Sequence, residues 1–324
     1  MADPNSSYTE LLTTTLEYRA PEIRDNVSDN IALLKRLNER GNADPYPGGA
    51  EIVEQLDWAE NSTYTRYTGY STIDISPQTV LTSANFSMKQ AAMSVTMSGT
   101  EQLQNSGSKE SIFNWLAARV KNAERSFRNN LSTDLYSSGT ASGGLQIGGL
   151  QLIVADAGTG TVGNIDSGTY SFWQNYVFDF SSNSLAASAS TIQQAMNTAW
   201  LNTKRNSDSI DLILADNTYY NYYWQSLQAI QRVQSSDSAQ AGFKSLDFMG
   251  ADVVPDGGQG GDCPSNHMYM LNTNYLHWRP HKDRNMVVIG GDRMSTNQDA
   301  FVRLLGWAGN LTCSNRSLQA VLVA

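Results

Sequence analysis

The chain contains little cysteine, little histidine and little charge for its 324 residues. Two cysteines, Cys263 and Cys313, cannot form the disulfide framework of a small secreted protein, so a reducing cytoplasm is the expected place of synthesis. No stretch approaches the ~18 consecutive apolar residues that a membrane helix needs. Residues 1–10 are acidic and lack an apolar run, so we expect no secretory signal. These absences argue against a membrane protein and against a disulfide-rich secreted one.

The charge balance is acidic. Lys and Arg total 22 while Asp and Glu total 31, which gives a net charge of −9. Charged residues make up only 16% of the chain, against roughly 25% in ordinary soluble domains. Proteins that grip a phosphate backbone have a basic footprint, which this composition does not provide. We therefore do not expect nucleic-acid binding to be the main activity.

Residues 1–50 are predicted to form an N-terminal arm rather than a domain. Short helices are indicated at 8–16 and 31–37, but prolines and glycines interrupt the segment, at Pro21, Pro45, Pro47, Gly48 and Gly49. Such a segment cannot bury enough apolar surface alone. A loosely tethered tail is an equally good interpretation, because termini are often disordered unless they dock.

The next part of the chain predicts three elements in succession. Thr, Tyr and Ser are dense over residues 58–88 and Ile recurs there, which indicates a long β-hairpin. Residues 91–97 alternate between apolar and polar, the period of a half-buried strand. Over 109–131 apolar residues recur every three or four positions, and the opposite face is charged. That pattern predicts a long amphipathic helix lying on an apolar surface.

After a Ser/Gly-rich connection at 137–149, helices and strands alternate as in an α/β domain. Helices are predicted at 192–204 and 217–233, with a buried strand between them at 210–215. Further strands are predicted at 269–271, 286–289 and 301–305, and a final hairpin should bring 318–323 back through a turn at 313–316.

One motif suggests a dinucleotide site. Gly158, Gly160 and Gly163 form a G-x-G-x-x-G pattern after an apolar run, and Asp179 follows about twenty residues later. An NAD-dependent oxidoreductase is therefore an alternative function. However, residues 164–175 lack a helical apolar stripe, so a bound phosphate would have no helix N-terminus to sit on. A plain glycine-rich loop is the better interpretation.

Three other clusters have plainer interpretations than a metal site or a base-stacking site. Residue types suited to zinc gather in one stretch, at Cys263, His267, His277 and His281, but their spacing matches no zinc motif and Pro280 prevents a regular helix. Residues 256–262 have the composition of a calcium loop without its ligand pattern, and are predicted to be a turn. The aromatic run at 219–224 has the spacing of a core-facing helix.

The predicted 58–88 hairpin is too long for its own domain. A compact chain of this length has a radius of gyration near ~20 Å, whereas strands of about a dozen residues reach about 40 Å. An isolated two-stranded hairpin is marginally stable in water, so it needs a partner. The expected partner is a second copy of the chain, contacted head to tail in a ring.

Several segments resemble the major capsid proteins of tailed double-stranded DNA bacteriophages. They are NSTYTRYTGYSTIDISP at 61–77, KQAAMSVTMSGTEQLQN at 89–105, NLSTDLY at 130–136, IGGLQ at 147–151, GTVGNID at 160–166 and FW at 172–173. The resemblance runs from about residue 50 to the end of the chain and does not include the arm.

The resemblance implies an α+β fold and a structural function without catalysis or a cofactor. The layout would be an arm (1–50), an extended loop (51–88), a peripheral domain with a long spine helix (89–135), an axial α/β domain (136–286) and a return to the peripheral domain (287–324). Hexamers and pentamers of the chain would form the icosahedral head of a virion, assembled in the host cytoplasm around DNA. Scaffolding, portal and decoration proteins would be further partners.

The resemblance also indicates which residues take part in assembly. In the extended loop they are Trp58, Tyr64, Arg66, Tyr67, Tyr70, Ile73 and Ile75, and on the charged face of the spine helix they are Arg119, Lys121, Arg125 and Arg128. Some relatives cross-link the shell through a lysine of the extended loop. Residues 58–88 contain no lysine, so we expect a non-covalent shell. A secreted adhesin, suggested by the Ser/Thr content, is disfavoured by the expected lack of a signal.

Overall fold

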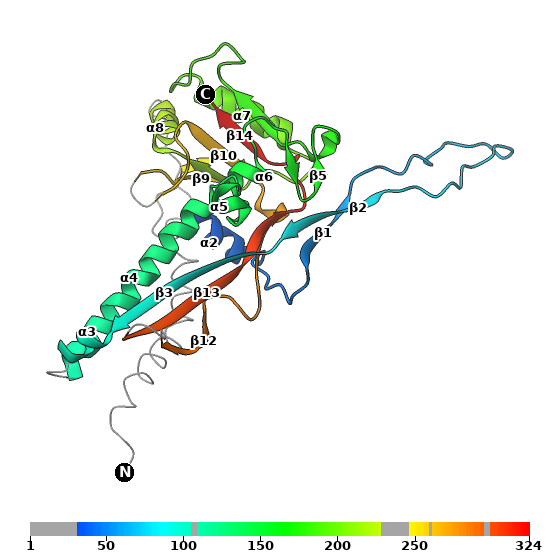
Figure 1. Cartoon of the computed structure of the whole chain (residues 1–324). Coiled ribbons are helices and arrows are strands. Elements are labelled where there is room, and N and C mark those ends of the chain that lie inside the picture. Colours follow the sequence, from blue (N-terminus) through cyan, green and yellow to red (C-terminus); the bar gives the residue numbers. More distant parts are fainter. Residues whose placement is uncertain (1–30, 105–108, 228–245, 259–260, 295–298) are drawn as a thin grey trace.

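The computed structural model describes residues 31–104, 109–227, 246–258, 261–294 and 299–324. Figure 1 shows a body built around one sheet, a second layer of long strands with a long helix beside it, and a thin ribbon that projects away from both. The fold is mixed α+β, as predicted. Within the described residues, no helix is both long enough and apolar enough to cross a membrane.

The body contains a six-stranded mixed sheet. Its order is β6 (Tyr176–Asp179), β14 (Ala320–Val323), β10 (His267–Leu271), β7 (Leu212–Ala215), β9 (Ala251–Pro255) and β8 (Leu246–Phe248). The helices α7 (Ile192–Thr203) and α8 (Asn217–Ser226) pack on it through a core of fully buried side chains. Buried Tyr219 and Tyr223 belong to that core, which confirms the core-facing interpretation of the aromatic run. Residues 228–233 of the predicted second helix lie outside the described part.

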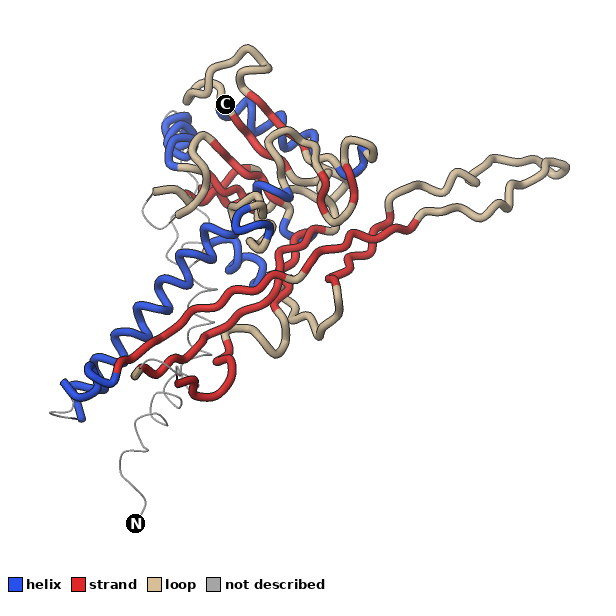
Figure 2. The backbone as a smooth tube through the Cα atoms, in the orientation of Figure 1, coloured by secondary structure: helices blue, strands red, loops and turns tan. Residues whose placement is uncertain are grey.

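A second sheet is built on one long strand, β13 (Ala300–Cys313). It pairs with β3 (Lys89–Ser98) on one side and with β11 (Leu276–Pro280) and β12 (Val287–Met294) on the other. The helix α4 (Lys109–Leu135) runs beside β3 (Figure 2). Both β3 and α4 were predicted from their periodicity. The helix continues to Leu135 because Leu131 and Leu135 are buried in the main core.

The remaining elements are short. They are α3 (Gly99–Gln104), α5 (Ala141–Gly144), α6 (Leu150–Ile153), β4 (Thr161–Val162), β5 (Ile165–Asp166), and the 3-10 helices η2 (Ser171–Trp173) and η4 (Thr273–Tyr275). The helix α3 begins with a capping box, because the Ser98 hydroxyl accepts the Glu101 N–H (3.2 Å) and the Glu101 carboxylate accepts the Ser98 N–H (3.1 Å). This fixes the junction between β3 and α3.

The extended hairpin is shorter in paired strand than predicted. β1 (Glu51–Asp57) and β2 (Leu81–Ser87) form a regular antiparallel ladder, whereas residues 58–80 contain no strand. The prediction of strands within 63–75 was therefore wrong for the single chain. The Thr, Tyr and Ile residues there have high β-propensity, but that propensity depends on neighbours on the same face, and the described part of the chain places no strand beside this segment.

The helix predicted at 31–37 exists as α2 (Ala32–Glu39), and it is docked. Leu33, Leu34 and Leu37 are buried in the main core, so the interpretation as a loose tail is wrong for this part of the arm. Residues 1–30, including the helix predicted at 8–16, lie outside the described part. The arm therefore has at least one anchored section.

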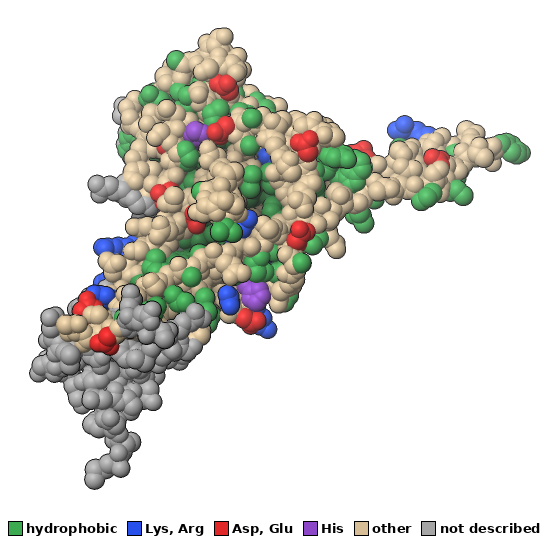
Figure 3. All heavy atoms as spheres, viewed as in Figure 1, with side chains coloured by type: hydrophobic (Ala, Val, Ile, Leu, Met, Phe, Trp, Pro, Cys, Tyr) green, Lys and Arg blue, Asp and Glu red, His purple; other side chains and the backbone are tan. Residues whose placement is uncertain are grey.

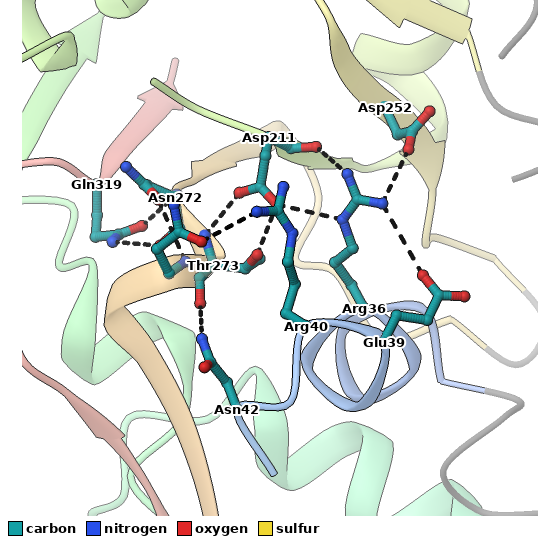
Figure 4. A network of polar contacts seen from close by, with 10 residues as sticks. Arg36, Glu39, Arg40, Asn42, Asp211, Asp252, Asn272, Thr273 and Gln319 are labelled. Atoms are coloured by element: carbon teal, nitrogen blue, oxygen red, sulfur yellow. Dashed lines mark hydrogen bonds and ion pairs between the residues drawn. The ribbon is translucent and has the colours of Figure 1, made fainter. Parts of the chain in front are cut away.

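A buried polar network holds α2 to the six-stranded sheet (Figure 4). The Arg36 guanidinium donates to the Asp211 carboxylate (3.2 Å) and lies 3.5 Å from the Asp252 carboxylate. Arg40 lies 3.0 Å from the same Asp211 carboxylate, to which the Thr273 hydroxyl also donates (2.6 Å). One carboxylate thus joins the arm, β7 and the 3-10 helix η4.

We expect Arg36→Met to lower the free energy of unfolding by about 2 kcal/mol, because hydrogen bonds to charged groups are worth roughly 1.5–3 kcal/mol. Asp252 would also lose its cation. Urea denaturation measures the effect, and Glu39→Gln is the matched control because the Glu39 side chain is 53% exposed at the edge of the same network. Equal stabilities for the two variants would contradict the anchoring function of Arg36.

The chain crosses between the sheets at different positions from those predicted. β11 pairs with β13, although residues up to 286 were assigned to the axial domain. Residues 318–323 do not form a final hairpin with the preceding strand. β14 instead lies between β6 and β10, one strand in from the edge of the other sheet, with Ala320, Val321 and Leu322 fully buried. The predicted hairpin pairs segments that are close in the sequence, whereas β14 pairs with β6 and β10, which are distant along the chain.

Candidate assembly surfaces

Residues 58–80 form a projecting loop with large apolar side chains in solvent (Figure 3). Ile75 is 91% exposed and Tyr64 is 78% exposed, and Tyr67, Tyr70 and Ile73 are also exposed. An exposed group of aromatic and branched side chains is typical of a surface that another molecule covers. Of the loop residues predicted to take part in assembly, these five lie in solvent in the isolated chain, as does Arg66.

The base of the projecting loop is fixed to the body. β1 alternates exposed and buried residues, and its inward Ile52 and Leu56 pack in a small core that includes Phe86 and Trp173. Trp58 differs from the other predicted loop residues because its ring packs against the Phe172 ring. The two ring centroids are 5.6 Å apart. The ribbon is therefore anchored where it leaves the body, and residues beyond Trp58 extend freely.

A buried ion pair that the sequence did not reveal also holds the ribbon. Glu54 is the one inward-facing acid of β1, and its carboxylate accepts hydrogen bonds from Arg279 of β11 (3.1 Å) and from the Thr312 hydroxyl of β13 (2.8 Å). Its partners lie more than two hundred residues away along the chain, at separations of 225 and 258. The only local signal is an acid at a position where the alternation of β1 requires an apolar residue.

The glycine-rich motif builds a contact with the ribbon rather than a phosphate site. After Gly160 the chain forms the short β4–β5 hairpin, and residues 164–175 contain no α-helix, as expected. Gly163 has φ +59° and its carbonyl accepts the Asn85 N–H of β2 (2.9 Å). Asp179 accepts hydrogen bonds from Ser181 and Ser182 of its own turn. The motif is explained by packing.

We expect Gly163→Ala to loosen the ribbon from the body. A Cβ at this position would lie 2.7 Å from the Cβ of Ala84, and the positive φ adds strain. The loss in free energy of unfolding should be about 2–4 kcal/mol, the sum of an overpacking and a backbone cost. Gly41→Ala is the matched control: Gly41 has a similar positive φ (+74°), but a Cβ there would meet no atom within 4 Å. A loss no larger than that of the control would contradict the packing explanation.

The histidines and cysteines do not assemble a metal site. His267 bonds to the Asp156 carboxylate (3.1 Å), and this hydrogen bond raises the pKa of His267. His277 and His281 lie in and just after β11, in the other sheet. Among the described residues, no group of three or more His, Cys, Asp or Glu could hold a metal ion.

The turn at 256–262 also has a structural explanation, in the residues that are described. The Tyr136 hydroxyl donates to the Asp256 carboxylate, and the Thr133 hydroxyl donates to the Asp262 carboxylate (3.1 Å). Both acids therefore tie the turn to the end of α4. The interpretation as a turn rather than a calcium loop agrees with these contacts.

The charged face of α4 divides into two parts. Arg119 donates to the Glu101 carboxylate (2.6 Å) and to the Thr96 carbonyl (2.8 Å), so it joins α4, α3 and β3 within one chain. Lys121, Arg125 and Arg128 follow at spacings of four and three residues and line one surface hollow of about 310 Å³. Such spacing places three cations in one stripe along the helix. Asn122 and Glu124 line the same hollow, so the three predicted cations share it with one acid.

No model of a known protein family matches the chain, and no curated protein matches it. Solved structures do match, over most of its length. The capsid asymmetric unit of cyanophage A-1(L) covers 87% of this chain and 90% of its own, with 16% identity and a TM-score of 0.63. The procapsid of satellite phage P4 covers 94% and 90%, at 8% identity and a TM-score of 0.51.

The same fold occurs outside phage heads. An encapsulin complex from Synechococcus elongatus covers 90% of this chain and 88% of its own, with 9% identity and a TM-score of 0.53. The capsid of a GTA particle is also among the matches. The chain therefore has the fold that tailed-phage major capsid proteins share with encapsulins and GTA capsids.

Proposed function

We propose that the chain is the major capsid protein of a tailed bacteriophage. Hexamers and pentamers of it would form an icosahedral head around double-stranded DNA, assembled in the cytoplasm of the bacterial host. The observation that carries the proposal is the projecting loop, since its exposed Tyr and Ile side chains require cover that the described chain does not supply. The chain then acts as a structural subunit and not as an enzyme.

Three parts of the molecule have distinct functions in this proposal. The six-stranded sheet is the axial domain, and the β13 sheet with α4 is the peripheral domain and its spine. Residues 51–88 form the extended loop, which lies over a neighbouring subunit. The arm clasps an adjacent subunit, with α2 as its anchored end. Scaffolding, portal and decoration proteins are the expected partners of such a shell.

A phage head is preferred to an encapsulin because of the sequence. The segments at 61–77 and 89–105 resemble phage major capsid proteins, and they belong to the loop and to the strand that follows it. Net charge −9 also suits an inner wall that must not bind packed DNA tightly, because like charges repel. The contents of particles made in the host distinguish the two: DNA supports the phage head, and a protein cargo supports an encapsulin.

The test is assembly of the purified chain. Light scattering and negative-stain microscopy should detect closed shells of uniform size when ionic strength, pH and crowding agents are varied. A species that remains monomeric under all of these conditions would contradict the proposal. Shells dissolved in detergent without heating should give one 35.5 kDa band, because no lysine is present in 58–88; higher-mass ladders would contradict a non-covalent shell.

A further inference from the structure

The imidazole ring of His267 faces a hydrogen-bond acceptor at each of its two nitrogens. Nδ1 lies 2.8 Å from the Ser265 carbonyl oxygen, and Nε2 lies 3.1 Å from Oδ2 of Asp156. A carbonyl oxygen and an ionised carboxylate can only accept. A neutral imidazole has one N–H to donate, whereas the imidazolium donates at both nitrogens. The two contacts together therefore require the cationic form of His267.

The Asp156 carboxylate depends on that cation in turn. Its Oδ2 accepts from Nε2 of His267, while its Oδ1 is buried and has no hydrogen-bond partner among the residues that the structure describes. A buried carboxylate oxygen without a donor is unfavourable, and a charge-assisted hydrogen bond offsets part of that penalty. Loss of the proton from His267 would remove the positive charge and one of the two hydrogen bonds of the ring.

Other ionisable groups are packed around the His267 ring. The Asp216 carboxylate, at the N-terminus of α8, adds to the negative potential there. Tyr269 of the same strand stacks on the ring, with the centroids 6.0 Å apart, and Sγ of Cys263 donates to the His267 carbonyl (3.8 Å). Burial raises the pKa of Tyr269 and of Cys263, which keeps both neutral. The neighbour in register on β14 is the uncharged Val323. The charge of the ring is therefore set by two acids.

The contact between Asp156 and His267 joins two parts of the body. His267 is the first residue of β10, whereas Asp156 lies in the turn after α6, directly before the glycine-rich motif. Further along that motif, the Gly163 carbonyl accepts the N–H of Asn85 in β2, at the base of the projecting loop (2.9 Å). The turn therefore lies, along the chain, between the attachment to the six-stranded sheet and the attachment to β2.

We propose that His267 and Asp156 form a pH-dependent latch, in which the protonated His267 holds the turn at 155–158 against β10, and loss of the proton releases the turn and loosens the contact with β2. The inference goes beyond the proposed function, because the latch acts within one subunit and does not depend on what a shell encloses. It is a conformational device that sets how firmly the body holds the base of the projecting loop.

The direction of the pH dependence follows from the acids around the ring. The hydrogen bond to Asp156 raises the pKa of His267 above its ordinary value of 6.5, against the opposing effect of burial. A group whose pKa is raised by folding contributes its full stabilisation below the pKa of the unfolded chain, and that contribution is lost as the pH rises through the folded value. The latch is therefore closed on the acidic side and open on the alkaline side.

Hydrogen–deuterium exchange of the full chain, followed by mass spectrometry, tests the latch at about pH 6 and about pH 9. After correction for the intrinsic effect of pH, the peptide that contains 154–163 should exchange about tenfold faster or more at the higher pH. The peptide that contains 81–87 should also exchange faster, because its contact with Gly163 loosens. Residues 192–203 of α7 are the internal reference and should show no change.

Two variants and a matched control complete the test. His267→Gln and Asp156→Asn should exchange rapidly in the 154–163 peptide at both pH values, because neither keeps the pair of imidazolium and carboxylate. His281→Gln is the control. Nδ1 of His281 accepts the Asp283 N–H (3.1 Å), so protonation at this nitrogen would break its hydrogen bond rather than form one. This variant should keep the pH dependence of the wild-type peptide.

The protonation of His267 is measured in the same samples, from deuterium exchange of its Cε1–H. Its midpoint should be higher in the wild-type chain than in Asp156→Asn. A wild-type midpoint at or below 6.5 would overturn the latch, and this measurement decides the question even if circular dichroism shows that the variants are unfolded.

Three exchange results would also overturn the proposal. They are equal wild-type exchange of 154–163 at both pH values, an unchanged pH dependence in His267→Gln, and opening of the turn without any change in 81–87. None of these results depends on assembly. A chain that stays monomeric contradicts the proposed function and leaves the exchange result standing.

Discussion

A chain in which residues 61–78 are replaced by Gly-Ser-Gly-Ser is expected to fold normally and to form no shells. The β1–β2 ladder is complete without these residues, and the Trp58 N–H already bonds to the Val80 carbonyl (3.0 Å), so a short link can close the hairpin. The removed segment contributes exposed side chains and no core residue. Its loss should therefore change the free energy of unfolding by less than about 0.5 kcal/mol, as surface changes do.

The same variant should remain monomeric under conditions in which the wild-type chain forms shells. Sedimentation velocity and negative-stain microscopy measure this directly. A variant with residues 61–78 in scrambled order controls for loop length, and it should also fail to assemble because its apolar side chains no longer match the surface that they cover. Closed shells from the shortened chain would show that the projecting loop is dispensable.

Arg316→Met is expected to have the largest effect on the stability of the subunit. Arg316 is fully buried, and its guanidinium donates to the Ile153 carbonyl (2.6 Å), the Trp173 carbonyl (3.0 Å) and the Asn175 side chain (3.0 Å). Burial lowers the pKa of Arg316 to about 10. The substitution removes the side-chain donor from the buried Ile153 and Trp173 carbonyls, while the Asn175 oxygen keeps the Ala155 N–H (3.1 Å), and we expect a loss of about 3–5 kcal/mol.

The measurement is urea denaturation of the shortened chain, which avoids any contribution from assembly. Arg284→Met is the matched control because Arg284 is exposed and its side chain bonds only weakly, to Gln90 at 3.3 Å. It should cost about 0.5 kcal/mol or less, as exposed contacts do. If Arg316→Met lowered the free energy of unfolding as little as the control does, the buried contacts of Arg316 would not stabilise the subunit.

The elements that the sequence predicted well are those with a regular local period. β3 and α4 follow from alternation over 91–97 and from three- and four-residue spacing over 109–131, and both are present. The same argument found α2 within the arm. These patterns depend on which face of an element is buried, and that face is encoded within a few residues.

The elements that were predicted wrongly depend on distant partners. Residues 58–80 have the composition of strands but no neighbour with which to pair, and β14 joins a sheet that its preceding strand does not enter. The pairs that position the site are equally non-local. Arg36 and Asp211 are separated by 175 residues, and Glu54 and Arg279 by 225. A single sequence gives no signal for such contacts, whereas the exposed loop residues could be identified because their segment was too long for a compact domain.

The position of β14 between β6 and β10 has a consequence for how the subunit folds. β6 and β10 cannot be joined until residues 320–323 have left the ribosome, because that strand lies between them and Val321 and Leu322 complete the two main cores. Pairing of such distant segments is slow and comes late in folding. A chain that lacks residues 320–323 therefore cannot close the six-stranded sheet and leaves apolar side chains of both main cores uncovered.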